Sequence, residues 1–454
     1  MKLNPIPAIC GLTLFLSLVT SGAEPGVLDL TSLANYASQP VPSYVTHDNT
    51  PPENPITDAG ATLGRVLFYD VRLSRNNTIS CSSCHDQSHA FSDANLASGG
   101  VAGTTGRHSM RLINTRFARE KRFFWDERAP TLEHQTTQPI QDHVEMGFSG
   151  TGGDPDFATL IGKLSAIPEY RVLFSMVFGD ASITEARIQK SIAQFVRSIQ
   201  SFDSKYDAGR ANAPDDLSNF ENFTAQENAG KLQFMRSPAQ GGAGCAACHV
   251  PPTFEIDPAS GNNGVIGRIG GGQDLTNTRA PSLRDLLGPG GPNGPFMHDG
   301  SMTGLGQITN HYRRAIPDNP NLDPRLRRPA LPFRNNELAP LRAFLHTLTG
   351  TSVYNDPKWS SPFDESGQLR VIVLPFNAIR IERNSETPAA PLVLRGQLAP
   401  NLDYRIEASA LYGDRELWET LATVRSDANG LVEYALTSGV GKMFYRFVYE
   451  VPTE

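Results

Sequence analysis

Apolar residues recur at helical spacing in two parts of the chain, and a capping box marks a third place where a helix should begin. Ser182 and Glu185 have the spacing of a capping box, and Thr224 and Glu227 repeat it, so a helix should begin at each pair. The first pair precedes a series of apolar residues three or four positions apart, which are Ile188, Ile192, Phe195 and Ile199. Another such series predicts a closing helix that ends at Gly350, and its members are Leu338, Leu341, Leu345 and Leu348.

From about residue 366 the hydrophobic period changes to two, which predicts strands instead of helices. Apolar residues then alternate with other positions in four places, namely Leu369, Val371 and Val373; Ile379 and Ile381; Tyr404, Ile406 and Ala408; and Met443, Tyr445, Phe447 and Tyr449. Asn429 and Gly430 form a dipeptide that is typical of hairpin turns. We expect residues 366–454 to form an antiparallel β-sandwich, which a linker over residues 351–365 joins to the helical part.

The first 23 residues predict a signal peptide. Lys2 precedes an apolar run over residues 9–19, which is too short to span a membrane comfortably. The small residues Ser21 and Ala23 stand at positions −3 and −1 of a cleavage site before Glu24. We therefore expect an exported, periplasmic protein without a transmembrane segment. Residues 24–55 are polar and rich in proline, and we expect them to form an arm over the surface.

The charge balance excludes one class of partner. The chain has 40 basic and 47 acidic residues, which give a formal net charge of −7. Proteins that bind nucleic acid usually carry a basic patch, so we expect no nucleic-acid partner. An acidic surface is compatible with a basic protein partner.

All cysteines after the signal peptide belong to two Cys-x-x-Cys-His motifs. The first motif contains Cys81, Cys84 and His85, and the second contains Cys245, Cys248 and His249. This is the attachment motif of c-type haem, because two thiols add to the two vinyl groups of a porphyrin and the histidine then lies below the iron. A thiol redox pair does not need the histidine, and a zinc site needs four ligands close in space. We predict two covalently bound c-type haems and no disulfide bonds.

A similar segment precedes each motif, over residues 57–68 and residues 224–234, which indicates an internal repeat. We therefore expect two similar haem domains, over residues 56–220 and residues 221–350.

The region between the two motifs carries a distinctive sequence. It reads Phe-Trp-Asp-Glu-Arg-Ala at 124–129, Leu-Glu-His-Gln at 132–135, Pro-Ile at 139–140 and Glu-Met-Gly at 145–147. With residues 84–93, 279–284 and 295–300, this region closely resembles the bacterial di-haem cytochrome c peroxidase and MauG family. The resemblance covers roughly residues 56–350 and leaves out the predicted β domain. Glu127 and His134 depart from it, because the family has glycine and glutamate at these two positions.

The resemblance implies a mainly α-helical protein with two cytochrome c-like haem domains, followed here by the β-sandwich. It implies that His85 is the proximal ligand of a haem that reacts with hydrogen peroxide. Glu145 is then the acid and base that moves the proton of the peroxide. Gln135 and Pro139 match positions that line the same pocket, and Trp125 matches a tryptophan that lies between the haems.

The second haem has His249 as one axial ligand, and the resemblance implies a choice for the other. Tyr312 lies fourteen residues after His298, where the peroxidases carry methionine and MauG carries tyrosine. A thioether raises the potential of a haem, whereas a phenolate donates charge and lowers it. Tyr312 therefore favours MauG-like chemistry, with Met297, Met302 and His311 as rival ligands nearby.

The family also has a calcium ion between its domains, held by an asparagine side chain and backbone carbonyls. This chain has His108 at the asparagine position, and the carbonyl positions match Asn293 and Pro295. Calcium prefers oxygen ligands, so imidazole is a poor replacement. The resemblance thus implies a calcium site in which one ligand is altered.

The sequence predicts a periplasmic di-haem peroxidase or oxidoreductase. It would react with hydrogen peroxide at the N-terminal haem and exchange electrons, through the C-terminal haem, with a small redox protein or an oxidised protein or organic substrate. The alternative is a non-catalytic di-haem electron-transfer protein, which would have no need of Glu145.

Overall fold

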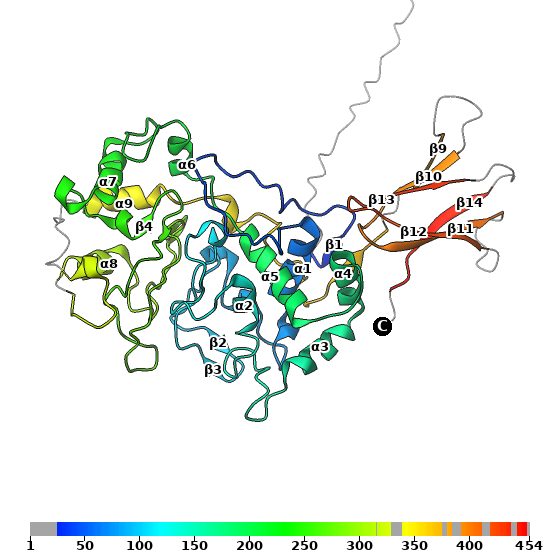
Figure 1. Ribbon diagram of the computed structural model, residues 1–454, viewed down its shortest axis with the longest axis horizontal. Coiled ribbons are helices and arrows are strands. Elements are labelled where there is room, and N and C mark those ends of the chain that lie inside the picture. Colours follow the sequence, from blue (N-terminus) through cyan, green and yellow to red (C-terminus); the bar gives the residue numbers. More distant parts are fainter. Residues whose placement is uncertain are drawn as a thin grey trace, which may run out of the picture.

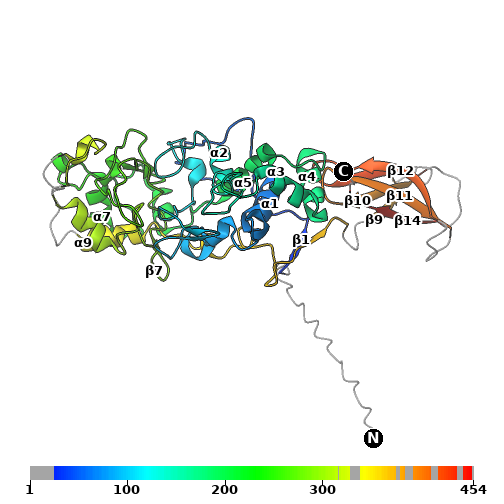
Figure 2. The ribbon, with the colours of Figure 1, turned by 90° about the horizontal axis from the view of Figure 1, so that it is seen from below.

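The computed structural model describes residues 25–314, 316–327, 338–374, 379–383, 392–410, 418–436 and 443–451. The predicted signal peptide lies outside these residues. The described chain forms three parts in a row, with α7, α8 and α9 at one end, α1 to α5 in the middle and strands β9 to β14 at the other end (Figures 1 and 2). Within the described residues, no helix combines the length and the hydropathy that a membrane span needs.

Helices dominate the first two parts. The α-helices of the described chain are α1 (Asp58–Tyr69), α2 (Leu132–Thr137), α3 (Phe157–Ser165), α4 (Pro168–Phe178), α5 (Glu185–Ser198), α6 (Lys205–Arg210), α7 (Ala225–Met235), α8 (Leu305–Tyr312) and α9 (Leu338–His346). Two short 3-10 helices, η2 (Cys81–Ser83) and η6 (Cys245–Ala247), each begin with the first cysteine of a haem motif. The middle part also holds the two-residue strands β2 (Gly99–Gly100) and β3 (Gly103–Thr104), which pair antiparallel.

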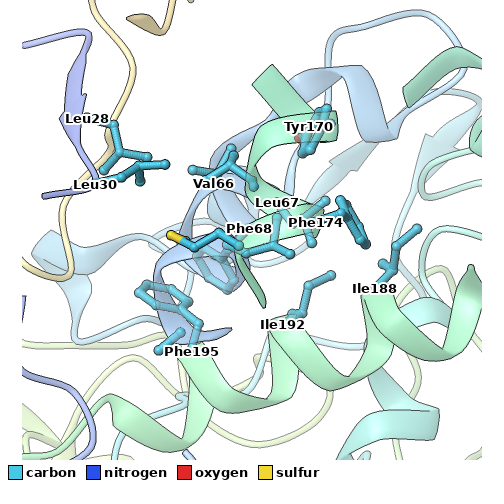
Figure 3. Packing of buried hydrophobic residues seen from close by; sticks show 14 of the residues in the cluster. Leu28, Leu30, Val66, Leu67, Phe68, Tyr170, Phe174, Ile188, Ile192 and Phe195 are labelled. Carbon is cyan, nitrogen blue, oxygen red and sulfur yellow. The ribbon is translucent and has the colours of Figure 1, made fainter. Parts of the chain in front are cut away.

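The middle part is built on the packing of α1, α4 and α5, whose apolar side chains converge in Figure 3. Gly64 of α1 permits close contact with α5, since a Cβ atom there would lie 1.9 Å from the Ser191 carbonyl oxygen. Helix α5 begins later than the capping box predicted. Its N-cap is Thr184, which accepts from the Arg187 amide, while the Ser182 amide is held by Asp180.

A second core lies between α7 and α9, and it includes Phe234, Phe254 and Phe344. The capping box of Thr224 and Glu227 is present as predicted. Gly230 permits close contact here, because a Cβ atom there would lie 1.9 Å from the Pro340 carbonyl oxygen. In both parts, the helix that precedes the haem motif packs on another helix at a glycine. This is the pattern that an internal repeat would have.

The second core extends beyond α7 and α9. It already includes Tyr206 of α6, which packs on Phe220 and Phe254, so the core begins before residue 221. Helix α9 ends at His346 and not at Gly350, although Leu348 beyond its end is still fully buried.

The C-terminal strands form two three-stranded antiparallel sheets, of order β13-β10-β9 and β12-β11-β14. Their bounds are β9 (Ile379–Arg383), β10 (Leu392–Gln397), β11 (Asp403–Ser409), β12 (Glu419–Arg425), β13 (Leu431–Ala435) and β14 (Phe444–Val448). The sheets meet where a Cβ atom on Gly396 of β10 would lie 2.7 Å from the ring of Phe447 on β14. The turn at Asn429 and Gly430 forms, but it leads from one sheet to the other and does not close a hairpin, since β12 and β13 pair with different strands.

Strand β8 (Arg370–Ile372) is not part of these two sheets. It pairs in parallel with β1 (Val27–Asp29) near the start of the described chain, with Leu28 opposite Val371. The N-terminal arm is therefore fixed to the chain that leads into the C-terminal strands.

Residues 351–365, which the sequence predicts as a linker, pack on the middle part. Trp359 is 1% exposed and belongs to its core, and its indole Nε1 donates to Ser198 Oγ at 3.3 Å. The carbonyl oxygen of Trp359 accepts from the Tyr69 hydroxyl at 2.6 Å, and the carbonyl of Lys358 accepts from the Tyr36 hydroxyl at 2.5 Å. This segment completes the core around α1 and α5.

We predict that Trp359→Ala lowers the free energy of unfolding by about 3–5 kcal/mol, the usual cost of deleting a buried aromatic side chain. Trp418→Ala is the control, because Trp418 is only half-buried and stacks with Arg446 among the C-terminal strands. Thermal unfolding of the holoprotein measures both. Equal losses in the two variants would show that residues 351–365 do not contribute to the core of the middle part.

Candidate functional site

The first haem motif opens into a cavity of about 670 Å³ in the middle part. Its lining brings together residues that lie far apart in the sequence, including Cys81, Cys84, His85, Trp125, Gln135, Pro139 and Glu145. Helix α2 positions Gln135, and its N-cap is Thr131, whose side chain accepts from the His134 amide. The structure thus gathers every residue that the sequence assigns to a peroxide pocket.

The orientation of His85 is set by the loop that follows it. Its Nδ1 atom lies 3.2 Å from the carbonyl oxygen of Phe91. A carbonyl oxygen can only accept, so Nδ1 carries the proton and Nε2 is left without one. This is the tautomer that a metal-binding histidine needs. Ala90 and Phe91 both adopt positive φ angles, of 54° and 59°, and turn the chain back towards the imidazole.

Glu145 is held by its main chain. Its amide donates to Asp142 Oδ1 at 3.0 Å, and its carbonyl accepts from the Val101 amide, in the turn between β2 and β3, at 3.0 Å. Gly100 allows this close contact, because a Cβ atom there would lie 2.1 Å from the carbonyl oxygen of Val144. The carboxyl group is therefore fixed at the cavity wall by contacts that do not use its own oxygens.

The electrostatic setting of Glu145 favours its neutral form more than water does. Its pKa is raised to about 7, first by burial and then by the negative charge of Asp142, against the opposing charge of Arg128. A carboxyl group with this pKa can both accept and return a proton at neutral pH.

A smaller cavity of about 340 Å³ adjoins Glu145. Its lining includes His134 and Gln138, and it shares Arg128, Asp142 and Glu145 with the first cavity. His134 and Asp142 are exposed, so this cavity lies between the carboxyl group of Glu145 and the surface.

The second haem motif opens into a cavity of about 240 Å³, whose lining includes Cys245, Cys248, His249, Met297 and Tyr312. The Nδ1 atom of His249 is buried and has no hydrogen-bond partner among the described residues. Burial, with the positive charge of Arg325, lowers the pKa of His249 to about 4, so its imidazole is neutral. A neutral imidazole is the form that binds a metal.

Two of the four candidate axial ligands line this cavity. Tyr312 ends α8, and its hydroxyl and the Met297 sulfur lie 3.4 and 3.3 Å from the same Asn263 amide nitrogen. Burial raises the pKa of Tyr312 to about 12. His311 and Met302 do not line the cavity, and the His311 imidazole Nε2 lies 2.9 Å from the carbonyl oxygen of Asn263 instead.

One wall, formed by residues 108–111 and Trp125 together with Arg279 and Pro281, lines both cavities. The indole Nε1 of Trp125 donates to the carbonyl of His108 at 2.7 Å, and the carbonyl of Trp125 accepts from the amides of Thr278 and Arg279 at 3.0 and 3.1 Å. Trp125 is thus fixed from both halves of the molecule.

Sequence patterns gave no signal for several charged residues at these cavities. Asp142 shifts the pKa of Glu145, and the buried residues Arg111 and Glu255 line the first cavity. Burial raises the pKa of Glu255 to about 8. A single arginine or glutamate is usually a surface residue, and Arg111 and Glu255 stand outside the motifs that carry the family resemblance.

The donor sets suit two covalent c-type haems. In each cavity two free thiols and one imidazole face the same space, and no disulfide joins the four described cysteines. This is the set that thioether attachment and axial ligation of iron require.

Comparisons with known proteins agree with this geometry. A family model described as "Di-haem cytochrome c peroxidase" matches residues 58–214. The methylamine utilization protein MauG of Methylophilus methylotrophus is 31% identical over 309 residues, which are 66% of this chain and 85% of that protein. The cytochrome c551 peroxidase of Nitrosomonas europaea is 31% identical over 344 residues, which are 74% of this chain and 90% of that protein.

A solved structure has the same fold over most of the chain. It is described as a MauG-like protein associated with microbial copper homeostasis, and it matches with a TM-score of 0.57 and 29% sequence identity. The match covers 71% of this chain and 98% of that one. The chain therefore belongs to the di-haem cytochrome c peroxidase and MauG family, a family of oxidoreductases that act on peroxide and whose name implies two c-type haems.

Proposed function

We propose that this chain is a MauG-like enzyme in which hydrogen peroxide reacts in the first cavity. Electrons are exchanged through the second cavity with a redox protein or an oxidised substrate. The observation that carries the proposal is Glu145, a half-buried carboxyl group with a pKa of about 7 in the same cavity as Cys81, Cys84 and His85. A non-catalytic electron carrier has no use for a proton-transfer group at this place.

Each haem, attached through two cysteines and bound by the neighbouring histidine, supplies an iron that exchanges single electrons. The residues around it would handle the protons. Reduction of one hydrogen peroxide to two waters takes two electrons and two protons. Glu145 would accept a proton from one peroxide oxygen and return it to the oxygen that leaves. The cavity lined by Arg128, Asp142 and His134 supports a path for peroxide and protons from the surface.

Trp125 is proposed as the bridge for electrons between the haems, since it lines both cavities and is held from both sides. Gln135 is proposed to line the peroxide pocket. For the second haem we propose Tyr312 and His249 as axial ligands. The support is that Tyr312 lines the same cavity as His249, whereas His311 and Met302 are outside its lining.

We further propose that the two cores belong to two cytochrome c-like haem domains and that the two C-terminal sheets form a sandwich. The cores described around α1 and α5 and around α7 and α9 support the first statement, and the contact between Gly396 and Phe447 supports the second. Export to the periplasm is proposed from the signal-peptide pattern of residues 1–23, and it agrees with covalent haem attachment.

We predict that Glu145→Gln retains both haems but lowers peroxide turnover by about 10²-fold or more, because the amide cannot transfer the proton. Glu221→Gln, at an exposed glutamate, is the control and should behave like the wild type. Steady-state turnover and the absorption spectrum measure the two properties. Unchanged turnover in Glu145→Gln would refute the role of Glu145 and favour the electron-carrier alternative.

A second prediction concerns pH. If the Glu145 carboxylate accepts the first proton, turnover should rise with pH through about 7 and then level off. Asp142→Asn keeps an oxygen acceptor for the Glu145 amide but removes the charge that raises its pKa, so the profile should move to lower pH. Asp215→Asn, at a distant exposed turn, should leave the profile in place. A pH profile that is the same in Asp142→Asn as in the wild type would contradict the assignment of Glu145 as the proton acceptor.

The third prediction tests the second cavity. Tyr312→Phe should change the ferric spectrum of the second haem, and Tyr312→Met should raise its potential, because a thioether favours ferrous iron relative to a phenolate. His311→Gln serves as the control, since its imidazole faces the Asn263 carbonyl. Optical and EPR spectra with a potentiometric titration give the answer. A spectrum that Tyr312→Phe leaves unaltered would make Met297 the ligand.

A further inference from the structure

Arg111 is a buried cation with unusually poor partners. It is 6% exposed, and it lines both haem cavities from the shared wall. Its Nη1 and Nη2 atoms reach only two carbonyl oxygens, those of Asn293 at 3.5 Å and Ser282 at 3.4 Å, while its Nε atom has no hydrogen-bond partner in the described chain. Among the described residues it forms no ion pair.

Two other buried arginines near the wall have closer hydrogen-bond partners than Arg111. Arg279 donates to the carbonyl oxygens of Glu120 and Arg122 at 3.1 and 2.5 Å. Arg284 forms a bidentate pair with Asp207, at 2.9 and 2.8 Å. Burying a charge is costly unless it is paired and hydrogen-bonded. Arg111 therefore has the longest hydrogen bonds of the three arginines and, unlike Arg284, no carboxylate partner among the described residues.

The two acidic residues whose charges act on Arg111 most strongly, Asp285 and Glu255, do not supply the hydrogen-bond partners that it lacks. Asp285 Oδ1 accepts from the Gly350 amide at 2.8 Å and from the Tyr354 hydroxyl at 3.1 Å, whereas its Oδ2 atom is buried without a hydrogen-bond partner among the described residues, so this carboxylate forms no hydrogen bond with Arg111. The carboxyl group of Glu255, with a pKa of about 8, carries little negative charge at neutral pH. Arg111 thus lines the space reserved for the haems without a hydrogen-bonded carboxylate among the described residues.

His108 and Asn293, two of the residues at the calcium positions of the family, do not fit the calcium site that the resemblance implies. The imidazole Nδ1 of His108 lies 3.1 Å from the carbonyl oxygen of Asn95, so this ring faces another loop. The carbonyl of Asn293, an expected ligand, faces the guanidinium of Arg111 instead. A divalent cation at that carbonyl would meet a fixed positive charge within a few ångströms, at low dielectric.

We propose that Arg111 is a binding group for a haem carboxylate, and that its guanidinium supplies from within the chain the positive charge that calcium would otherwise supply between the haems. A c-type haem retains two propionate groups, and the pairing of a guanidinium with a carboxylate is the strong, often bidentate interaction that Arg111 lacks. This inference rests on the proposal that both cavities hold haem. The haem content per chain tests that proposal separately.

The first experiment measures metal in the holoenzyme. We expect calcium well below one ion per chain after desalting, and we expect EGTA to leave the potentials of both haems unchanged. One calcium ion per chain, removed by EGTA with a change in either potential, would overturn the proposal.

The second experiment uses potentiometric titration of Arg111→Gln and Arg111→Lys, with Arg314→Gln at an exposed site as the control. Loss of the charge should favour ferric iron in at least one haem on the order of tenfold, which is about 59 mV for one electron. The lysine variant should stay near the wild type. A shift in Arg111→Gln no larger than that in Arg314→Gln would refute the role of Arg111.

If Arg111→Gln fails to retain haem, the Arg111→Lys variant and the calcium measurement still test the proposal. Retention of haem and potentials by Arg111→Lys supports the proposal. Failure of both variants, or the presence of removable calcium in the wild type, counts against it.

Discussion

The two halves of the helical region are joined by main-chain hydrogen bonds at the wall between the cavities. The carbonyl of Trp125 accepts hydrogen bonds from two amides of the second half. The amide of His108 donates to the carbonyl of His298 at 2.8 Å. The indole of Trp125 then ties these two positions together through its own bond to His108. Main-chain bonds fix distance and orientation without depending on side-chain identity. The spacing of the two haem motifs, and any electron path between them, depends on this wall.

Low dielectric gives the charged groups near this wall their chemical character. Glu145, Glu255 and Arg111 all lie at cavity surfaces where water is largely replaced by protein. The pKa values of the two carboxyl groups rise, because burial of a neutral carboxyl group costs less free energy than burial of a negative charge. A guanidinium has no such option, since it stays protonated at any physiological pH. Its charge persists, and it constrains which ligands the wall can accept.

The sequence predicted those features whose signal is local. A Cys-x-x-Cys-His motif and the capping box of Thr224 need only neighbouring residues, and the motif from Phe124 to Gly147 is long enough to identify the family. Contacts between distant segments left no such signal. The pairing of β8 with β1, the burial of Trp359 and the passage of the Asn429 turn between two sheets all depend on which distant surface is available. Arg111 belongs to the same class, because its significance lies in the partners that it lacks.

The contact between Tyr36 and Lys358 spans 322 positions of sequence, and β1 and β8 join segments that are even farther apart. During synthesis the chain around α1 and α5 emerges long before Trp359, which completes its core. Contacts of such high sequence separation form late and slowly. We therefore expect the first Cys-x-x-Cys-His segment to remain accessible until these distant contacts have formed. The enzymes that attach haem would then act on an open precursor, and the arrival of residues 353–372 would close the structure around a cofactor that is already bound.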